Sequence, residues 1–512
     1  MGAGCSGGPD GRDLQERPTT PADDADWTLS AEPASLTIFP LEQALVTLTV
    51  SRADLYDVEI VPDGKPERAV SLRPGETSRA IALDWLDSPG DHLLRLRATA
   101  IGSRKTAETV VRVRQLGDFP GVDTTFGKDG LALGPFAGFF GTPSQLHALA
   151  DGRLLVAGHG RRALTDESVV FLGALDSTGT PDVTFGDQGL VRLPSRVEDP
   201  FRSFRVVGLE SDSTGRIVSC LRTDGTSRSL LERYEPDGTL DATFGVDGQI
   251  EVDLSASSIA LDSGHRILVL GNQPARFGMG QVVLQRFLET GELDTSFGES
   301  GSVSRWADSR DGMVRIDPTG RSTAAFCVAD ECDFARLEPN GRLDAGFGVD
   351  GGVRLDVRRH FDLLPGGGYS FFQSYVRSTK GSDREISFTR LRPDGTRDEA
   401  FGPGGLQRME LPFKAALSAA QDGVSYVAGV EEPEHVLSHQ RWGLARFSPN
   451  GALDTSFGRA GLLYTTLRQG DSRAAPWMNR PIAGVVDGDG RLVLAGALAD
   501  DTDLQMYFVR YR

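Results

Sequence analysis

The chain has 512 residues, a net charge of −18 and a hydrophobic content of 39%. That hydrophobic content supports a folded core and excludes a largely disordered chain. The negative charge argues against nucleic-acid binding, which needs a basic surface. Glycine makes up about 12% of the chain, against a usual share of roughly 7%, which indicates the many tight turns of an all-β protein. No apolar run reaches the roughly 18–20 residues that a membrane-spanning helix needs.

Residues 1–25 are rich in Gly, Pro and Asp, and they predict a disordered tether. The segment Ala3–Cys5 resembles the end of a bacterial lipoprotein signal, so we expect the true start to lie upstream, with Cys5 as the lipidated N-terminus. Two alternatives stay open. Gly2 and Ser6 also fit the N-myristoylation pattern, with Cys5 available for palmitoylation, or the tail is unmodified.

Residues 26–115 predict a β-sandwich of short strands separated by Pro-Gly and Asp-Gly turns. Val46, Leu48 and Val50 alternate with threonines, which is the pattern of a half-buried strand. The expected strands are Ser35–Phe39, Ala44–Ser51, Asp57–Val61, Ala80–Asp84, His92–Ala98 and Thr106–Arg114. The unit resembles the Ig-like modules of bacterial surface proteins, without the Cys…Trp…Cys core of antibody domains. That resemblance implies a role in spacing or adhesion.

Residues 117–512 carry the motif Asp-x-x-Phe-Gly-x-x-Gly seven times, at spacings between 50 and 59 residues. Its aspartates are Asp123, Asp182, Asp241, Asp294, Asp344, Asp398 and Asp454. Its phenylalanines are Phe126, Phe185, Phe244, Phe297, Phe347, Phe401 and Phe457. A fixed period of this length indicates a solenoid, a propeller or another array. Each period contains four short strands joined by glycine turns, and the first is expected to be the run after the last motif Gly, such as Leu190–Leu193 or Val353–Val357. Four strands in each period predict a seven-bladed β-propeller.

The segment Leu337–Gly348 resembles the delta-60 repeat of a bacterial β-propeller family, and the resemblance covers about 395 of the 512 residues. Val122, Pro181 and Arg397 replace the Leu that precedes the motif aspartate in the other repeats. The resemblance implies a propeller in a cell-envelope or secreted setting, and no established activity. Closure stays open: repeats one and seven join directly, or a strand near Val111–Gln115 completes a mixed blade.

Seven motif carboxylates suggest metal ligands or catalytic acids, but seven equivalent copies around a ring favour a structural role. A short Asp side chain accepts backbone N–H bonds in turns, Phe fills the space between blades, and Gly permits positive φ. We therefore interpret the motif as a joint between blades, and expect no catalytic residue, no metal and no cofactor. His435 and His439 lie in an expected loop and Asp487–Gly490 in an ordinary turn, so both are weak metal candidates.

Cys327 and Cys332 lie on successive expected strands, where a hairpin would bring them within disulfide range. Cys220 lies in an apolar strand and is expected to be a buried thiol. No further Cys or His at ligand spacing indicates a zinc site.

Strand alternation predicts that the regular turns share one end of the propeller and the dissimilar loops share the other. Variation confined to one face often marks a binding face, although unconstrained loop drift would look the same. Aromatic and basic residues of these loops are the candidate binding residues: Phe136, Phe139, Phe140, Arg161, Arg162, Phe201, Arg276, Phe277, Arg377, Lys380, Trp442 and Trp477.

We expect a monomeric, non-enzymatic cell-envelope or secreted protein that binds protein or polysaccharide, touching a membrane only through a lipid anchor. The alternative is a propeller enzyme, of the lyase or quinone-dependent dehydrogenase type, with a site at the central channel. That alternative predicts a polar cluster of His, Asp and Arg on channel-facing positions.

Overall fold

The computed structural model describes residues 27–38, 44–52, 58–62, 70–72, 75–83, 90–100, 105–115, 121–162, 168–193, 204–223, 226–273, 281–306, 311–328, 331–355, 360–374, 384–431, 441–465, 481–500 and 503–512. The expected tether and Cys5 lie outside these residues. The chain divides near residue 117 into two compact units, which are described separately. Strands make up both units, and the described residues contain no α-helix, only a short 3-10 turn, η3 (Pro403–Gly405).

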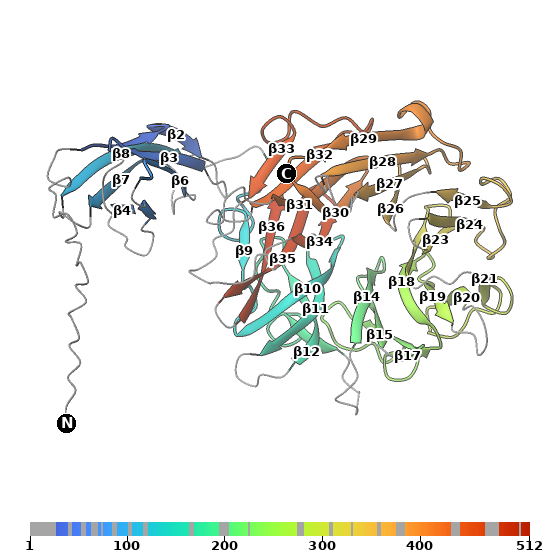
Figure 1. Ribbon diagram of the computed structural model, residues 1–512. Coiled ribbons are helices and arrows are strands. Elements are labelled where there is room, and N and C mark those ends of the chain that lie inside the picture. Colours follow the sequence, from blue (N-terminus) through green and yellow to red (C-terminus); the bar gives the residue numbers. More distant parts are fainter. Residues whose placement is uncertain are drawn as a thin grey trace, which may run out of the picture. The chain divides into compact units, whose positions relative to one another are not determined.

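The first unit contains two sheets (Figure 1). The smaller has the order β1-β3-β6 and the larger β2-β8-β7-β4-β5. The strands are β1 (Leu29–Glu32), β2 (Ser35–Ile38), β3 (Ala44–Val50), β4 (Val58–Pro62), β5 (Val70–Leu72), β6 (Ser78–Leu83), β7 (Gly90–Ala100) and β8 (Thr106–Gln115). Strands β1 and β5, of four and three residues, were not expected from the sequence because such short runs show too little alternation.

The core of the first unit lies between its two sheets. Val46 and Leu48 of β3 share one buried cluster with Leu96 of β7 and Val111 of β8. The alternating side chains of both sheets therefore face each other, as in a β-sandwich.

The described residues of the second unit form seven four-stranded antiparallel sheets (Figure 1). The first is β10 (Phe139–Ala148), β11 (Leu154–Arg162), β12 (Ser168–Leu175) and β13 (Leu190–Leu193). The second is β14 (Phe204–Ser211), β15 (Ile217–Thr223), β16 (Ser229–Tyr234) and β17 (Gln249–Val252). The third is β18 (Ser255–Leu261), β19 (Ile267–Gln273), β20 (Gln281–Phe287) and β21 (Ser302–Trp306). The fourth is β22 (Asp311–Ile316), β23 (Ser322–Val328), β24 (Glu331–Leu337) and β25 (Gly352–Leu355).

The fifth sheet is β26 (His360–Leu363), β27 (Tyr369–Ser374), β28 (Glu385–Leu391) and β29 (Leu406–Glu410). The sixth is β30 (Lys414–Gln421), β31 (Val424–Glu431), β32 (Arg441–Phe447) and β33 (Leu462–Thr465). The seventh combines β34 (Pro481–Val486), β35 (Leu492–Asp500) and β36 (Asp503–Tyr511) with β9 (Leu131–Leu133), which comes from the other end of the unit.

The first strands of the sheets surround a common axis. Each contacts the first strand of the next sheet, and β34 of the last contacts β10 of the first. The fourth strands therefore lie at the rim (Figure 1). Buried apolar clusters fill the space between neighbouring sheets, as between the first and second, where Leu155 and Leu172 pack with Val206 and Leu221. This is the architecture of a β-propeller.

One expectation about strand order is corrected, and one of the two open alternatives for ring closure is excluded. The short run after the last motif glycine is the fourth strand of the preceding sheet, because β13 pairs with β12, and it does not open a new sheet. Val111–Gln115 does not complete a mixed sheet, because it belongs to β8 in the first unit. Closure instead joins repeats one and seven, since β9 pairs with β36.

Candidate functional site

The motif aspartate organises a tight turn between the third and fourth strands of a sheet. In the second sheet, one carboxylate oxygen of Asp241 accepts bonds from the N–H and hydroxyl of Thr243, at 2.9 and 2.6 Å. The other oxygen accepts the Nε–H of Arg233 at 2.7 Å. The same pairing recurs in Arg286–Asp294, Arg336–Asp344, Arg446–Asp454 and Arg510–Asp123. The carboxylates are thus engaged in local structure.

The motif phenylalanine connects each sheet to the next one. Arg233 lies over the ring of Phe244, 4.8 Å from its centroid, and donates to the carbonyl of Glu289 in the following repeat. Phe244 is fully buried, and its ring lies beside Gly291 of that same turn. Equivalent contacts join Phe126 to Gly179, Phe185 to Gly238, Phe297 to Gly341, Phe347 to Gly395, Phe401 to Gly451 and Phe457 to Gly121. We call this Asp, Arg and Phe set the joint.

The regular and the dissimilar connections lie at opposite ends of the propeller. Because the strands of each sheet are antiparallel, the first-to-second and third-to-fourth connections lie at the same end. These connections carry the glycine turns and the motif, and we call this end the motif end. The other connections share the opposite end, the loop end, and their lengths differ widely. Two residues separate β23 from β24 (329–330), whereas ten separate β27 from β28 (375–384).

Several candidate binding residues fall outside what the structure describes. Arg276, Phe277, Arg377 and Trp477 are among them, and for Arg161 and Arg162, at the end of β11, only the backbone is described.

The expectation for Trp442 is wrong. This residue lies near the start of β32 and is 1% exposed, with its ring 4.6 Å from that of Tyr507 in the neighbouring sheet. Phe136 and Phe139 are also buried, in the cluster between the seventh and first sheets. These aromatic side chains stabilise contacts between sheets and are not available to a partner.

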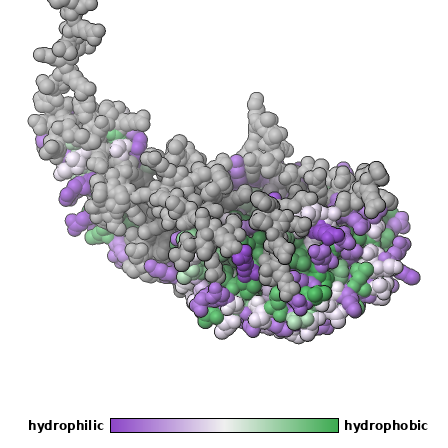
Figure 2. Space-filling model, turned by 90° about the horizontal axis from the view of Figure 1, so that it is seen from below, coloured by the Kyte–Doolittle hydropathy of each residue, from purple (hydrophilic) through white to green (hydrophobic). Residues whose placement is uncertain are grey.

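Apolar residues at the motif end are exposed singly. Val183, Val246 and Val349 are 62%, 74% and 81% exposed, each in a separate motif turn. Figure 2 shows hydrophobic and hydrophilic residues interspersed over the described surface in its view. Scattered apolar residues are normal on a soluble surface and indicate no docking site.

A cavity of about 530 Å³ lies at the loop end, among the inner strands of the first three sheets. It is formed by the starts of β10, β14 and β18 and the ends of β11 and β15. Its lining residues are Ser144, Gln145, His159, Arg205, Val206, Val207, Arg222 and Ser257. This volume lies within the range of small-molecule sites, roughly 300–1,000 Å³.

Three bulges shape this cavity. The strand register skips Ser144 in β10, Val207 in β14 and Ser257 in β18, so each is the extra residue of a β-bulge at an equivalent place. A bulge redirects a side chain out of the normal alternation. The Ser144 hydroxyl donates to the Ala157 carbonyl at 3.1 Å, which fixes that side of the cavity.

Two arginines give the cavity its positive charge, and a histidine lies beside them. Arg205 and Arg222 are direct partners across β14 and β15. Arg222 forms no ion pair with any residue that the structure describes. His159 Nε2 lies against the carbonyl of Phe204. Because a carbonyl only accepts, Nε2 must carry the proton, and in the neutral ring Nδ1 is an acceptor.

A second polar group lies at the axis, deeper toward the motif end. His147, Glu210, Arg315 and Asp362 occupy equivalent register positions, opposite Leu155, Val218, Thr323 and Ser370. We call these four residues the axial cluster. The equivalent positions in the other sheets are Ala260, Ala419 and Val485. Short aliphatic side chains therefore occupy the three remaining positions at this level of the axis.

The members of the axial cluster interact across several sheets. Nε2 of His147 lies 2.8 Å from the Ser211 hydroxyl, and its Nδ1 lies 4.0 Å from a carboxylate oxygen of Glu210. Burial raises the pKa of Glu210 to about 7, partly offset by the positive charge of Arg315. Burial likewise raises the pKa of Asp362 to about 6, against the same Arg315 charge, and lowers that of His147 to about 4. His147 and Glu210 side chains nevertheless keep 21% and 31% of their surface accessible.

Sequence reasoning missed both polar groups. His147 and Glu210 stand two residues before the first-to-second turn in their repeats, so aligning the repeats on that turn would have found the axial cluster. The Arg205–Arg222 pairing depends on strand register, which the bulge at Val207 shifts by one residue, and no sequence pattern marks that bulge.

The weak metal candidates divide into two cases. Asp487 accepts bonds from Arg491 Nε at 2.8 Å and from the N–H of Asp489 at 3.0 Å, as in an ordinary turn. His435 and His439 lie outside the described residues. Within the described ranges, no three His, Cys, Asp or Glu side chains are grouped so that they would hold a metal ion.

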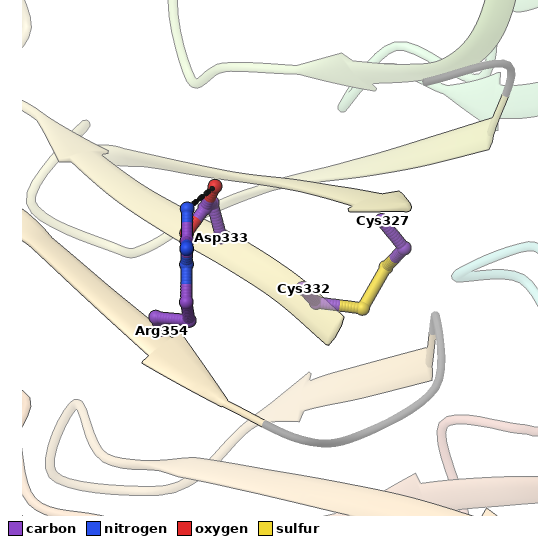
Figure 3. The surroundings of a disulfide bond; sticks show 4 residues. All are labelled: Cys327, Cys332, Asp333 and Arg354. Atoms are coloured by element: carbon purple, nitrogen blue, oxygen red, sulfur yellow. Dashed lines mark hydrogen bonds and ion pairs between the residues drawn. A yellow bond between two sulfur atoms is a disulfide. The ribbon is translucent and has the colours of Figure 1, made fainter. Parts of the chain in front are cut away.

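Cys327 and Cys332 form a disulfide that links β23 to β24 (Figure 3). Beside it, Asp333 pairs with Arg354 of β25 at 2.6 Å, which ties the third strand to the fourth. Cys220 is a buried free thiol whose pKa is raised to about 12 by burial, so it is protonated and unreactive.

Comparisons with known proteins support the propeller. Residues 211–244 and 435–457 match a family described as "Domain of unknown function (DUF5122) beta-propeller". No curated protein matches the chain. The crystal structure of a Salmonella alpha-2-macroglobulin mutant is similar at 10% identity and a TM-score of 0.15, and the alignment covers 94% of this chain but 39% of that one. Such a low score carries no argument. The described residues include no helix long and apolar enough to cross a bilayer. The sheet topology and this partial match both indicate a β-propeller in the second unit.

Proposed function

We propose that this protein is a non-enzymatic binding protein of the cell envelope or its surroundings, which holds a protein or polysaccharide at the loop end of a seven-bladed propeller. In this proposal, residues 26–115 form an Ig-like spacer, and lipidated Cys5 is its membrane anchor. The monomer is the expected form.

The cavity at the loop end carries the proposal. Its walls come from three sheets, and it lies at the end where the connections differ most from repeat to repeat. A rigid scaffold that presents variable loops around a concavity is a common arrangement for ligand binding. The joints at the motif end, by contrast, satisfy their own polar groups.

Binding of the full-length protein to a panel of purified envelope polysaccharides and proteins tests the proposal. Replacing Arg161, Arg162 and Trp477 together with Ala should weaken binding of the selected ligand at least tenfold. A matched triple variant at the motif end, Glu338→Ala, Arg342→Ala and Val349→Ala, should bind as the unaltered protein does. Equal effects of the two triple variants would contradict a binding face at the loop end.

The axial cluster supports a second candidate function, catalysis at the axis. Two carboxyl groups with pKa values raised to about 7 and 6 beside an arginine are suited to proton transfer near neutral pH. This is the kind of polar cluster that the enzyme alternative predicted for the channel.

Turnover of the polysaccharides that the protein binds would test that candidate, measured as new reducing ends and as absorbance of unsaturated products. Glu210→Gln and Asp362→Asn should each abolish turnover while leaving binding intact. If no bound polysaccharide is cleaved by the unaltered protein, catalysis at the axis is excluded for that ligand class.

A further inference from the structure

We infer that the loop-end cavity binds the carboxylate of a small hydroxylated acid, such as a uronic acid, either free or as a residue of an acidic polysaccharide. The inference rests on the proposed function and names the ligand class of that same site.

The paired arginines are the first argument. Like charges directly opposite each other on neighbouring strands destabilise a sheet. Arg205 and Arg222 occupy such positions, and both line the cavity. A carboxylate between the two guanidinium groups would accept charge-assisted hydrogen bonds from both, and such bonds are about twice as strong as neutral ones.

The net charge of the chain strengthens this argument. At −18, the protein as a whole repels anions. Among the described residues of its lining, the cavity has two arginines and no acidic side chain, so it is a local exception. Its affinity for an anion must come from these short-range contacts and not from the long-range field.

The remaining lining residues fit the rest of such a ligand. Ser144, Gln145 and Ser257 provide hydroxyl and amide groups, and His159 presents Nδ1. These groups suit an acid that carries several hydroxyls. The described lining has no aromatic ring, so stacking with a nucleobase or another flat ligand has no basis here.

Calorimetric titration with D-galacturonate and with D-galactose tests the inference, because the two sugars differ only in the carboxylate at C6. At low salt the full-length protein should bind galacturonate at least tenfold more tightly than galactose. The double variant Arg205→Gln, Arg222→Gln should lower galacturonate affinity at least tenfold. Arg342→Gln, which removes an exposed arginine at the motif end, should leave it unchanged.

Titration with polygalacturonate distinguishes a free acid from an acidic polysaccharide as the ligand. Polygalacturonate that binds more tightly per residue than the monomer would identify a polysaccharide, and equal binding would identify the free acid; both support the inference. Should the double variant unfold, Arg222→Gln alone and the salt dependence of galacturonate binding by the unaltered protein replace it. A tenfold rise in Kd in high salt is expected.

Equal binding of the two sugars, or undiminished galacturonate binding by the arginine variants, would overturn the inference. If galacturonate binds no more tightly than galactose, while an envelope ligand binds and the Arg161, Arg162 and Trp477 variant loses it, the inference fails and the proposed function stands. If galacturonate binding depends on Arg205 and Arg222 while no envelope ligand depends on those loop residues, the wider proposal fails and the inference stands.

Discussion

In the first sheet, Ala174 occupies the position that an arginine holds in the third strand of the other six sheets. Arg153, from the turn between β10 and β11, replaces it: its guanidinium reaches Asp182 at 3.1 Å and the carbonyl of Pro236 at 3.0 Å. The joint thus depends on where the guanidinium lies and not on which strand supplies it.

Replacing Arg153 with Ala should therefore destabilise the propeller by about 1–3 kcal/mol, because Asp182 is left without its charged partner. Arg266→Ala is the matched control. Arg266 lies in the equivalent turn of the third sheet, and its side chain is 35% exposed. Among the described residues, its guanidinium bonds Asp262 of its own turn and nothing in the next repeat. Its loss should cost less than about 1 kcal/mol. Urea unfolding of both variants measures the difference in stability. If both variants lose the same free energy of unfolding, Arg153 does not act as the arginine of the first joint.

The axial cluster should make stability depend on pH. The pKa of Glu210 is raised by burial from 4.5 to about 7. A carboxyl group with a raised folded pKa favours the folded state below its unfolded pKa, and that contribution is lost as pH rises through the folded pKa. The window therefore runs from about pH 4.5 to pH 7.

The variant Glu210→Gln lacks this titration, so it should gain about 1–3 kcal/mol relative to the unaltered protein between pH 4.5 and pH 8. His147, Arg315 and Asp362 remain in both proteins, and their contributions cancel to first order in the comparison. Chemical unfolding at several pH values gives the result. If the difference in unfolding free energy between the two proteins does not change with pH, the Glu210 carboxyl group is solvated as in the unfolded chain.

At the scale of strands, the sequence was sufficient to predict the repeat and its turns, but not to predict which strands pair within a sheet. Motif spacing predicted the four strands per period, because glycine turns and apolar runs are local features. It could not show that β13 closes a sheet, since a run of four residues fits either neighbour equally well. The hairpin that carries the motif decides this, because Asp182 N–H donates to the carbonyl of Ala174 and brings the chain back beside β12.

The candidate site was harder to predict for the same reason. The loop end was correctly distinguished from the motif end, because alternation fixes which connections share an end. Trp442 was misplaced because an aromatic residue beside a variable loop has the same local sequence whether it faces solvent or the next sheet. Burial between sheets is a long-range property.

The glycine of the turn in each repeat gives a test of the joint as an element. Gly238 has φ +84°, and an added Cβ would lie 2.8 Å from Val191 and 3.0 Å from Phe185. Gly490 has φ +79° and open space around its Cβ position. Gly490→Ala should cost about 1 kcal/mol from backbone strain alone.

Gly238→Ala should cost about 2–4 kcal/mol, because overpacking against a buried ring adds to that strain. Thermal unfolding compares the two variants at one pH. If both lose the same stability, the contact between Phe185 and the next repeat contributes nothing beyond backbone conformation.

For the whole propeller, the seventh sheet holds the two ends of the unit together. Strand β9 pairs with β36, and Asp123 pairs with Arg510 at 2.7 Å across 387 residues of sequence. Burial alone would raise the pKa of Asp123, but hydrogen bonds from Thr125 and the charge of Arg510 outweigh it and hold that pKa at about 2. The other sheets are each formed from one continuous stretch of chain, so their joints have a covalent path beside them.

Arg510 and Arg286 make the same contacts with an aspartate, a phenylalanine ring and a carbonyl of the next repeat. The variants Arg510→Gln and Arg286→Gln should nevertheless differ in the hydrogen exchange of β9. Each loses a buried pair at a cost of about 3–5 kcal/mol. In Arg510→Gln the loss also frees residues 121–133 to separate from β36, because no covalent connection keeps them there. The rate of hydrogen exchange at β9 should then rise at least tenfold in Arg510→Gln and remain unchanged in Arg286→Gln. Equal exchange rates in both variants would mean that packing between β34 and β10, rather than the joint, holds the ring closed.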